Sequence, residues 1–202
     1  ALAAKSPAGT PATRIFGQPD DTTAVPNAGS LVPSARSLRD PRGLFVTETR
    51  LWVADSGNHR VLAFDRAGGP DAVRVLGQRD FKSGDLRPTA ADTLAAPEGA
   101  WSDGTRLFVA DTANHRVLIW NKLPESDDAP ADVVLGQESM SVGAPNRGGA
   151  SAGPATLSFP TAVLVAGGAL FVADSGNNRV LRWNAVPTQS GMPADAVLGQ
   201  PD

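Results

Sequence analysis

One eleven-residue phrase occurs three times in this chain and limits the possible folds more than any other feature. Seven of its eleven positions are identical in all three copies (Val, Ala, Asp, Asn, Arg, Val and Leu). Self-similarity at a fixed period is the mark of a repeat architecture, in which each copy forms one structural unit. The copies are WVADSGNHRVL at 52–62, FVADTANHRVL at 108–118 and FVADSGNNRVL at 171–181.

A second phrase, Val-Leu-Gly-Gln, follows each copy, and a relative of it, IFGQPD at 15–20, precedes the first one. The glycines of these phrases are Gly17, Gly77, Gly136 and Gly199, so that successive units are 60, 59 and 63 residues long. The chain therefore contains three copies of one unit, and the end of a further unit stands in front of them.

Each unit is predicted to form β-structure throughout. A Leu-x-x-Pro segment leads into a short apolar stretch, then a turn, then Leu-Trp-Val-Ala or its equivalent, a tight turn, Arg-Val-Leu, a polar loop and Val-Leu-Gly. Four short strands between turn signals indicate a four-stranded antiparallel meander. Because the strands are apolar on both faces, each sheet must be buried on both sides. Sheets stacked as blades around a common axis bury each other in this way.

The repeated turn places an aspartate directly opposite an arginine, for example Asp55 opposite Arg60. Side chains opposed in this way interact, and a carboxylate–guanidinium pair contributes about 0.2–1 kcal/mol. Because Ala113 would resist a positive φ, we expect the asparagine of the turn to take the left-handed position. The structural residues of the repeat are Asp55, Asn58, Arg60, Asp111, Asn114, Arg116, Asp174, Asn177 and Arg179.

The tails Asn-His-Arg-Val-Leu at 58–62 and 114–118, with the variant Asn-Asn-Arg-Val-Leu at 177–181, resemble the signature of the NHL repeat. The long period and the Val-Leu-Gly-Gln phrase are similar to those of bacterial secreted or surface NHL-repeat proteins. This resemblance implies a β-propeller, commonly six-bladed, around a central channel. Some members are peptidyl-hydroxyglycine amidating lyases with zinc held by several histidines, and others bind proteins or RNA or act as sensors.

The expected fold class is all-β: three blades of four-stranded antiparallel meanders plus one N-terminal outer strand, an incomplete propeller that we expect to be six-bladed. Residues 1–13 are expected to be a flexible linker and 14–20 the outer strand of a preceding blade. Since propellers need roughly four to eight blades, either the chain is part of a longer propeller or two chains complete one ring as a homodimer. The expected blades cover 38–80, 94–139 and 157–202.

The composition offers few residues that could bind a metal or carry out catalysis. The chain has no cysteine and two histidines, His59 and His115, which share one repeat column where the third copy has Asn178. We therefore interpret both as turn residues and expect no metal, no cofactor and no catalytic group. The Asp/Arg pairs recur in every unit, as scaffold residues do.

The net charge of −3 argues against nucleic acid as a partner, and no apolar run is long enough to enter a membrane.

Two columns of aromatic residues are expected to pack in the core or between blades. The first contains Trp52, Phe108 and Phe171, and the second contains Phe64, Trp120 and Trp183.

Residues that differ between copies are better candidates for binding. The column directly after each Leu-x-x-Pro segment holds Arg42, Glu98 and Thr161, where the chain enters the innermost strand at the mouth of the channel. The loop at 125–132 is acidic and its carboxylates could gather a hard cation, but their spacing favours a solvated loop. These carboxylates are Glu125, Asp127, Asp128 and Asp132.

Taken together, the sequence predicts a non-catalytic binding or scaffolding propeller, secreted, periplasmic or on the surface of a bacterium. It would recognise a protein or another extracellular ligand through its rim loops and channel mouth. The alternative is a fragment of a propeller enzyme, a lyase or hydrolase, with its catalytic residues in blades outside this chain. A third hypothesis, nucleic-acid binding, requires a basic rim.

Overall fold

The computed structural model of the chain describes residues 14–200, so the expected linker at 1–13 lies outside the described residues. The described part contains three four-stranded antiparallel sheets, each made of four consecutive strands in chain order. We call them blade 1, blade 2 and blade 3. Every sheet is a simple meander, as the turn signals predict, and the expected all-β fold class is confirmed.

Blade 1 consists of β1 (Pro41–Val46), β2 (Arg50–Asp55), β3 (Arg60–Asp65) and β4 (Ala72–Leu76). Blade 2 consists of β5 (Gly99–Ser102), β6 (Leu107–Asp111), β7 (Arg116–Trp120) and β8 (Val133–Leu135). Blade 3 consists of β9 (Pro160–Ala166), β10 (Ala169–Asp174), β11 (Arg179–Trp183) and β12 (Ala196–Leu198). The turns and loops carry the short 3-10 helices η1 (Pro26–Gly29), η2 (Ser56–Asn58), η3 (Thr112–Asn114), η4 (Pro145–Gly148) and η5 (Ser175–Asn177).

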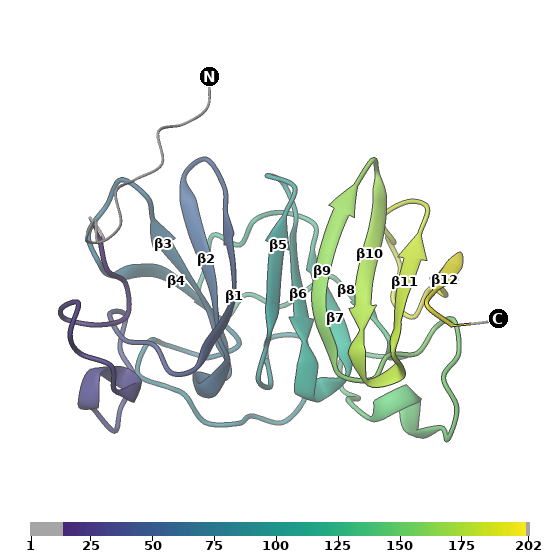
Figure 1. The fold of residues 1–202 in the computed structure, drawn as a ribbon, viewed down its shortest axis with the longest axis horizontal. Coiled ribbons are helices and arrows are strands. Elements are labelled where there is room, and N and C mark those ends of the chain that lie inside the picture. Colours follow the sequence, from purple (N-terminus) through teal and green to yellow (C-terminus); the bar gives the residue numbers. More distant parts are fainter. Residues whose placement is uncertain (1–13, 201–202) are drawn as a thin grey trace.

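The blades lie side by side in chain order, from the purple and blue end to the green and yellow end of Figure 1. Their first strands, β1, β5 and β9, contact one another along the inner side of the array. The fourth strand of each blade lies at the far edge of its sheet. This is the arrangement of consecutive propeller blades, with the innermost strands nearest a common axis.

Two hydrophobic clusters fill the spaces between the blades, one between blades 1 and 2 and the other between blades 2 and 3. The repeated aromatic columns provide much of both clusters. Burying one such side chain contributes about 1.5–3 kcal/mol, so these clusters hold the blades face to face. Trp52 and Trp120 belong to the first cluster and Phe108 and Trp183 to the second, whereas the buried Phe64 packs in a separate cluster of blade 1.

The segment at 14–20 does not form the expected outer strand. A strand needs a hydrogen-bonded neighbour, and no other strand pairs with this segment among residues 14–200. Its position nevertheless follows the repeat. Phe16, the counterpart of Leu76 in the Val-Leu-Gly-Gln phrase, packs edge-on against Phe64 with ring centroids 5.0 Å apart. The segment thus covers one face of blade 1 as the end of a preceding blade would.

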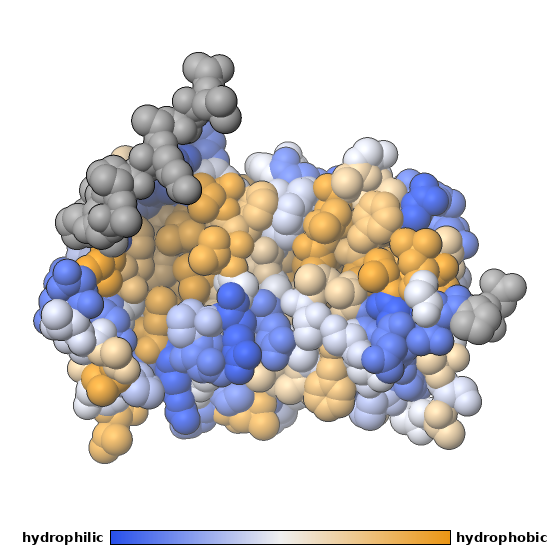
Figure 2. All heavy atoms as spheres, viewed as in Figure 1, coloured by the Kyte–Doolittle hydropathy of each residue, from blue (hydrophilic) through white to orange (hydrophobic). Residues whose placement is uncertain are grey.

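The two end faces of the array are the least covered. On blade 1, Leu44 is 67% exposed, and on blade 3, Leu198 is 52% exposed. Figure 2 shows hydrophobic surface gathered over the first and third sheets. Phe171 is half-buried, although its repeat counterparts Trp52 and Phe108 are buried against the next blade. Phe171 is less buried than its counterparts because no blade of the described chain follows it.

Candidate functional site

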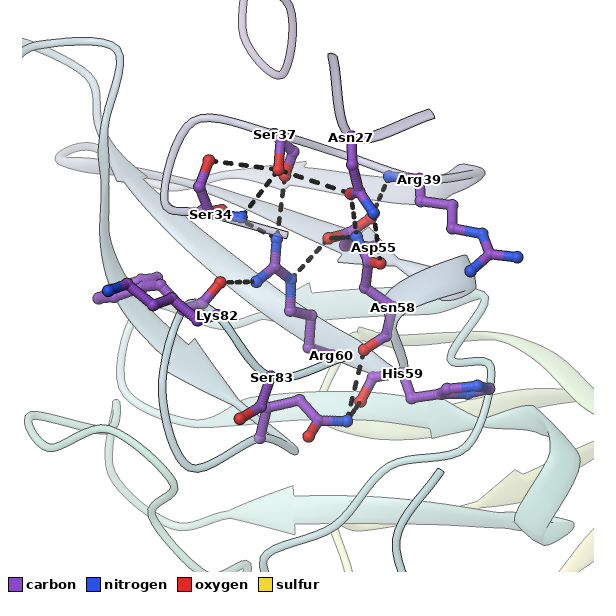
Figure 3. A network of polar contacts seen from close by, with 12 residues as sticks. Asn27, Ser34, Ser37, Arg39, Asp55, Asn58, His59, Arg60, Lys82 and Ser83 are labelled. Carbon is purple, nitrogen blue, oxygen red and sulfur yellow. Dashed lines mark hydrogen bonds and ion pairs between the residues drawn. The ribbon is translucent and has the colours of Figure 1, made fainter. Parts of the chain in front are cut away.

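The repeated turn of blade 1 forms a buried polar network (Figure 3). Asp55 and Arg60 are opposed across β2 and β3, as the hairpin arithmetic predicts. Arg60 donates from Nε to Oδ2 of Asp55 at 2.6 Å, and Asn58 donates to the same oxygen at 2.8 Å. The other carboxylate oxygen accepts the backbone N–H of Arg39 at 2.6 Å. Asp55 therefore ties the hairpin to the segment that leads into β1.

The guanidinium of Arg60 also bonds to backbone carbonyls from two further segments. It donates to Ser34 and Ser37, which precede blade 1, at 3.0 and 2.9 Å, and to Phe81, which follows blade 1, at 2.7 Å. One side chain thus joins the hairpin, the leading loop and the trailing loop. Figure 3 shows the guanidinium between Asp55 and the segment that carries Ser34 and Ser37.

The same network recurs in the other blades. Arg116 donates to Asp111 at 2.7 Å and to the carbonyls of Ala90, Thr93 and Met140. Arg179 donates to Asp174 at 2.7 Å. Its guanidinium also bonds to the carbonyls of Gly153 and Thr156.

Burial makes the Asp/Arg pairs more important for stability than the sequence alone predicts. The sequence predicts a modest cross-strand pair, but the side chains of Asp55, Arg60, Asp111 and Arg116 are fully buried. Burial raises the pKa of Asp55 and of Asp111, and the paired guanidinium opposes this rise. Breaking a buried, hydrogen-bonded ion pair costs about 3–5 kcal/mol because the remaining charge has no partner. These residues hold the blades in shape and are closed to a substrate.

The histidine of the turn, and not the asparagine, takes the left-handed position. His59, His115 and Asn178 have φ of 53°, 52° and 54°. The expectation for asparagine is wrong because Asn58 lies inside the 3-10 turn, where its amide bonds to Asp55. The left-handed conformation therefore falls on the next residue along the chain.

Each histidine reaches the next blade. Nδ1 of His59 accepts the backbone N–H of Ala96 at 3.0 Å, and Nδ1 of His115 accepts that of Phe159, also at 3.0 Å. Burial lowers the pKa of both imidazoles. Since a ring nitrogen that accepts a hydrogen bond carries no proton, each histidine links two blades in its neutral form.

The candidate channel-mouth residues start the inner strands. Arg42 is exposed in β1, whereas Glu98 directly precedes β5 and is half-buried. A hydrogen-bonded pair with Asp40 raises the pKa of Arg42, and the nearby charge of Glu98 raises it further. Thr161 in β9 shares a 2.5 Å hydrogen bond with Ser175 of its own blade. The structure thus places Arg42 and Glu98 in one electrostatic environment, with Thr161 on the adjoining inner strand.

Glycines let the inner strands approach closely at this point. A Cβ on Gly99 would lie 2.8 Å from the carbonyl oxygen of Thr161, and a Cβ on Gly43 would collide with the carbonyl oxygen of Glu98. In both cases the obstacle is backbone of the next blade, which cannot rotate aside. The backbones that carry Arg42, Glu98 and Thr161 are therefore held in fixed positions relative to one another.

The acidic loop is not the freely solvated segment that its composition predicts. Asp127 accepts the backbone N–H of Val75 at 3.1 Å and pairs with Arg74, both in β4 of blade 1. Asp128 pairs with Arg87 at 2.7 Å. Asp132 accepts the backbone N–H of Asn121 at 2.7 Å. Asp127 thus joins blades 1 and 2, and Asp128 ties the acidic loop to the loop before blade 2. Glu125 borders a small cavity between the two blades.

Sequence reasoning misses the role of the repeated glutamine. Gln78 donates to the carbonyls of His59 and Asp85, and Gln137 does the same with His115 and Ala144. Both side chains are buried. The repeated Val-Leu-Gly-Gln phrase is the signal that could have identified them, because a polar residue repeated beside buried strands needs buried partners.

The described residues offer neither a metal-binding cluster nor a membrane-spanning helix. Between residues 14 and 200, no three or more His, Asp or Glu side chains lie together in a way that could hold a metal ion. In the same range, no helix has the length and apolar character required to cross a bilayer.

The comparisons with known proteins assign no family. No family model matches the chain, and no curated protein matches it. Among solved structures, the chain is similar to Kuenenia stuttgartiensis hydrazine synthase, with 15% sequence identity and a TM-score of 0.47. The match covers 80% of this chain and 36% of that one. The chain therefore spans about a third of the length of that protein.

Proposed function

We propose that this chain is part of an NHL-type β-propeller that binds a protein or another extracellular ligand and catalyses no reaction. The turn sequences Asn-His-Arg-Val-Leu and Asn-Asn-Arg-Val-Leu support the assignment to this repeat type. The similarity to bacterial secreted and surface proteins supports a place outside the cytoplasm. Ligand recognition would use the channel mouth and the loops around it.

One observation carries this proposal: the repeated polar residues of blades 1 and 2 are buried, and the residues that break the repeat lie at the inner strands. The Asp, Asn and Arg side chains of each turn are hydrogen-bonded to one another. Arg42 is exposed and Glu98 half-buried, with opposite charges on a rigid backbone. Fixed, complementary charges at a surface give an interface its specificity and speed association.

A displayed library of random peptides tests the proposal and does not require the natural ligand to be identified first. The library is selected against the protein, and the affinity of the enriched peptides is then measured for variants. We expect Arg42→Gln and Glu98→Gln to weaken binding about tenfold, since each removes a charge from the site. Turnover of the enriched peptides is monitored in the same samples.

The matched controls are Arg79→Gln and Glu48→Gln, which remove the same charges from exposed positions elsewhere on the blades. Both should bind like the unmodified protein. Enriched peptides that are indifferent to Arg42 and Glu98 would refute the assignment of the site. Cleavage or elimination of a bound peptide would refute a function in binding alone.

A further inference from the structure

The loop between the third and fourth strands is shorter in blade 1 than in the other two blades. It connects an aromatic residue of the third strand to an alanine whose backbone N–H donates to the leading loop of the same blade. Seven residues connect these positions in blade 1 (65–71), whereas ten connect them in blade 2 (121–130) and in blade 3 (184–193). The alanines are Ala72, Ala131 and Ala194.

In blade 2 this loop covers the outer edge of β4 in blade 1. Val75 of β4 donates its backbone N–H to Oδ1 of Asp127 at 3.1 Å, and its carbonyl accepts the N–H of Asp128 at 2.9 Å. The same carboxylate oxygen pairs with Arg74 at 3.1 Å. An edge strand exposes unpaired N–H and carbonyl groups, and here one aspartate and the N–H that follows it provide the partners.

Blade 3 covers the edge of β8 in the same way. Val134 of β8 donates its N–H to Oγ of Ser190 at 3.1 Å and accepts the N–H of Gly191 at 2.9 Å. Counted back from the shared alanine, Ser190 and Gly191 stand where blade 2 has Asp127 and Asp128. The repeat therefore uses a side-chain oxygen for the N–H of the strand and the next backbone N–H for its carbonyl.

The equivalent edge in front of blade 1 lacks this cover. By its distance from the repeated glycine, Ile15 takes the position of Val75 and Val134. Among residues 14–200, neither the backbone N–H nor the carbonyl of Ile15 takes part in a hydrogen bond. The counterpart of Asp127 in the short loop is Gly68, which has no side chain to provide an acceptor.

Arg14 corresponds to Arg74 but has no carboxylate partner. No ion pair within residues 14–200 includes it. Its guanidinium donates instead to three backbone carbonyls, those of Arg66, Gly68 and Gly69. These neutral acceptors leave its positive charge uncompensated. Arg14 and the N–H of Ile15 are thus the counterparts of the two groups that Asp127 bonds in blade 1.

A cavity of about 610 Å³ lies at this edge, within the usual size range of small-ligand sites. Among the described residues, its lining includes Arg14, Ile15, Arg36 and Pro70 but no aspartate or glutamate. Arg36 pairs with Asp71, which lies outside the lining. The positive charge of the lining favours an acidic ligand. None of the channel-mouth residues lines the cavity, so this site is separate from the one proposed above.

The pattern of partners favours a peptide over a simple anion. Ile15 presents both a donor and an acceptor, and an extended peptide pairs with both when it lies along a strand edge. A carboxylate ion alone has no N–H to donate. Residues 1–13 contain neither aspartate nor glutamate, so the segment before Arg14 provides no carboxylate for the site.

We propose that this cavity binds an acidic peptide segment of a partner protein, with one aspartate as its anchor. The aspartate carboxylate accepts the N–H of Ile15 and pairs with Arg14, as Asp127 does with Val75 and Arg74. The backbone N–H of the next peptide residue donates to the carbonyl of Ile15. The partner thus takes the place of the loop residues that blade 1 lacks.

Titration of the isotope-labelled protein with the peptide Glu-Ser-Asp-Asp-Ala-Pro-Ala, the sequence of residues 125–131, tests the proposal. Acetylated and amidated ends remove the terminal charges. The peptide should saturate one site and shift the amide resonance of Ile15. Sodium acetate is the control for a simple anion and should not saturate the site over the same concentrations. No saturable shift with the peptide, or acetate binding as tight as that of the peptide, would overturn the proposal.

Two peptide variants separate the anchor from net charge. Asparagine in place of the first aspartate should weaken binding about tenfold or more, because that carboxylate bonds both Arg14 and the N–H of Ile15. Asparagine in place of the second should weaken it less than about fivefold, the range of an exposed ion pair. Since both variants lose the same charge, equal losses would contradict the anchoring geometry.

Two protein variants test the other side of the contact. Arg14→Gln should weaken binding of the peptide about tenfold, because it removes the charged partner of the anchor. Arg79→Gln removes an exposed charge outside the cavity and should leave binding unchanged. Binding by Arg14→Gln as tight as that of the unmodified protein would refute the site.

An exchange of loops provides an internal competitor. Replacing residues 65–71 by the sequence of 121–130 gives blade 1 the full-length loop, with its own aspartates to cover Ile15. This protein should no longer bind the peptide, while the resonances of blades 2 and 3 stay in place. Unchanged binding would contradict the proposal. The peptide variants and Arg14→Gln decide the question even where the exchanged protein does not fold.

Discussion

The backbone N–H of Phe159 donates a 3.0 Å hydrogen bond to Nδ1 of His115, across the boundary between blades 2 and 3. The aromatic ring of Phe159 also packs edge-on against the imidazole, with centroids 4.2 Å apart. His59 and Ala96 make the equivalent hydrogen bond between blades 1 and 2. The histidine that gives the repeat its signature is thus a link between consecutive blades.

These links predict that the protein loses stability in mild acid. Burial lowers the pKa of His59 and His115 below the ordinary value of 6.5, and the positive charge of Arg39 lowers that of His59 further. Nearby aspartates oppose both shifts. The unfolded chain therefore binds more protons than the folded chain near that pH, so that stability rises with pH. The full contribution is present above pH 6.5 and decreases as the pH falls toward the lowered values.

Urea denaturation at several pH values measures this effect. The control is the double variant His59→Asn, His115→Asn, because blade 3 has Asn178 at the same position. Its midpoint should depend less on pH between about 7 and 5, the range around the ordinary histidine pKa. The same slope in both proteins would show that other groups cause the dependence.

Arg116→Leu should lower the free energy of unfolding by about 3–5 kcal/mol, because it leaves the buried carboxylate of Asp111 without its counter-ion. The comparison is Arg50→Gln, which breaks the exposed pair with Asp65 and should cost less than about 1 kcal/mol. The side chains of the first pair are 0% exposed and those of the second 36% and 42%. Chemical denaturation measures both values, and similar losses would contradict the scaffold role of the buried network.

Gly99→Ala should destabilise the protein by about 1–3 kcal/mol, the usual cost of extra atoms in a packed interior. The new methyl group would meet the Thr161 carbonyl at the boundary of blades 2 and 3. The matched change is Ala162→Gly, at the same register position of blade 3 on an exposed surface. We expect it to cost about 1 kcal/mol or less, from backbone entropy alone. Thermal unfolding of both variants gives the comparison.

Much of the fold can be predicted from the sequence because its strongest signals are local. The opposition of Asp55 and Arg60 follows from counting residues across a hairpin, and the structure has this register in all three blades. The stacking of sheets follows from strands that are apolar on both faces. Both inferences need only the repeat itself.

What the sequence does not reveal depends on contacts between units. From the sequence, Asp127 and Asp128 are interpreted as solvent-exposed. In the structure, Asp127 pairs with Arg74, 53 residues away, and Asp128 pairs with Arg87, 41 residues away. The left-handed conformation of His59 is not predicted, because the sequence does not show that the side chain of Asn58 is hydrogen-bonded to Asp55. The shared conformation of the loops Pro-Asn-Ala-Gly and Pro-Asn-Arg-Gly is visible only when their backbones are compared.

The most direct test of the stacked-blade account is a through-hydrogen-bond nuclear magnetic resonance coupling between the Phe159 amide nitrogen and Nδ1 of His115. We predict a measurable coupling at neutral pH that disappears when the imidazole is protonated, and no such coupling in His115→Asn. A coupling-free amide, or a His115 imidazole with its proton on Nδ1 at neutral pH, would contradict the account, because the two blades would then not be joined through this histidine.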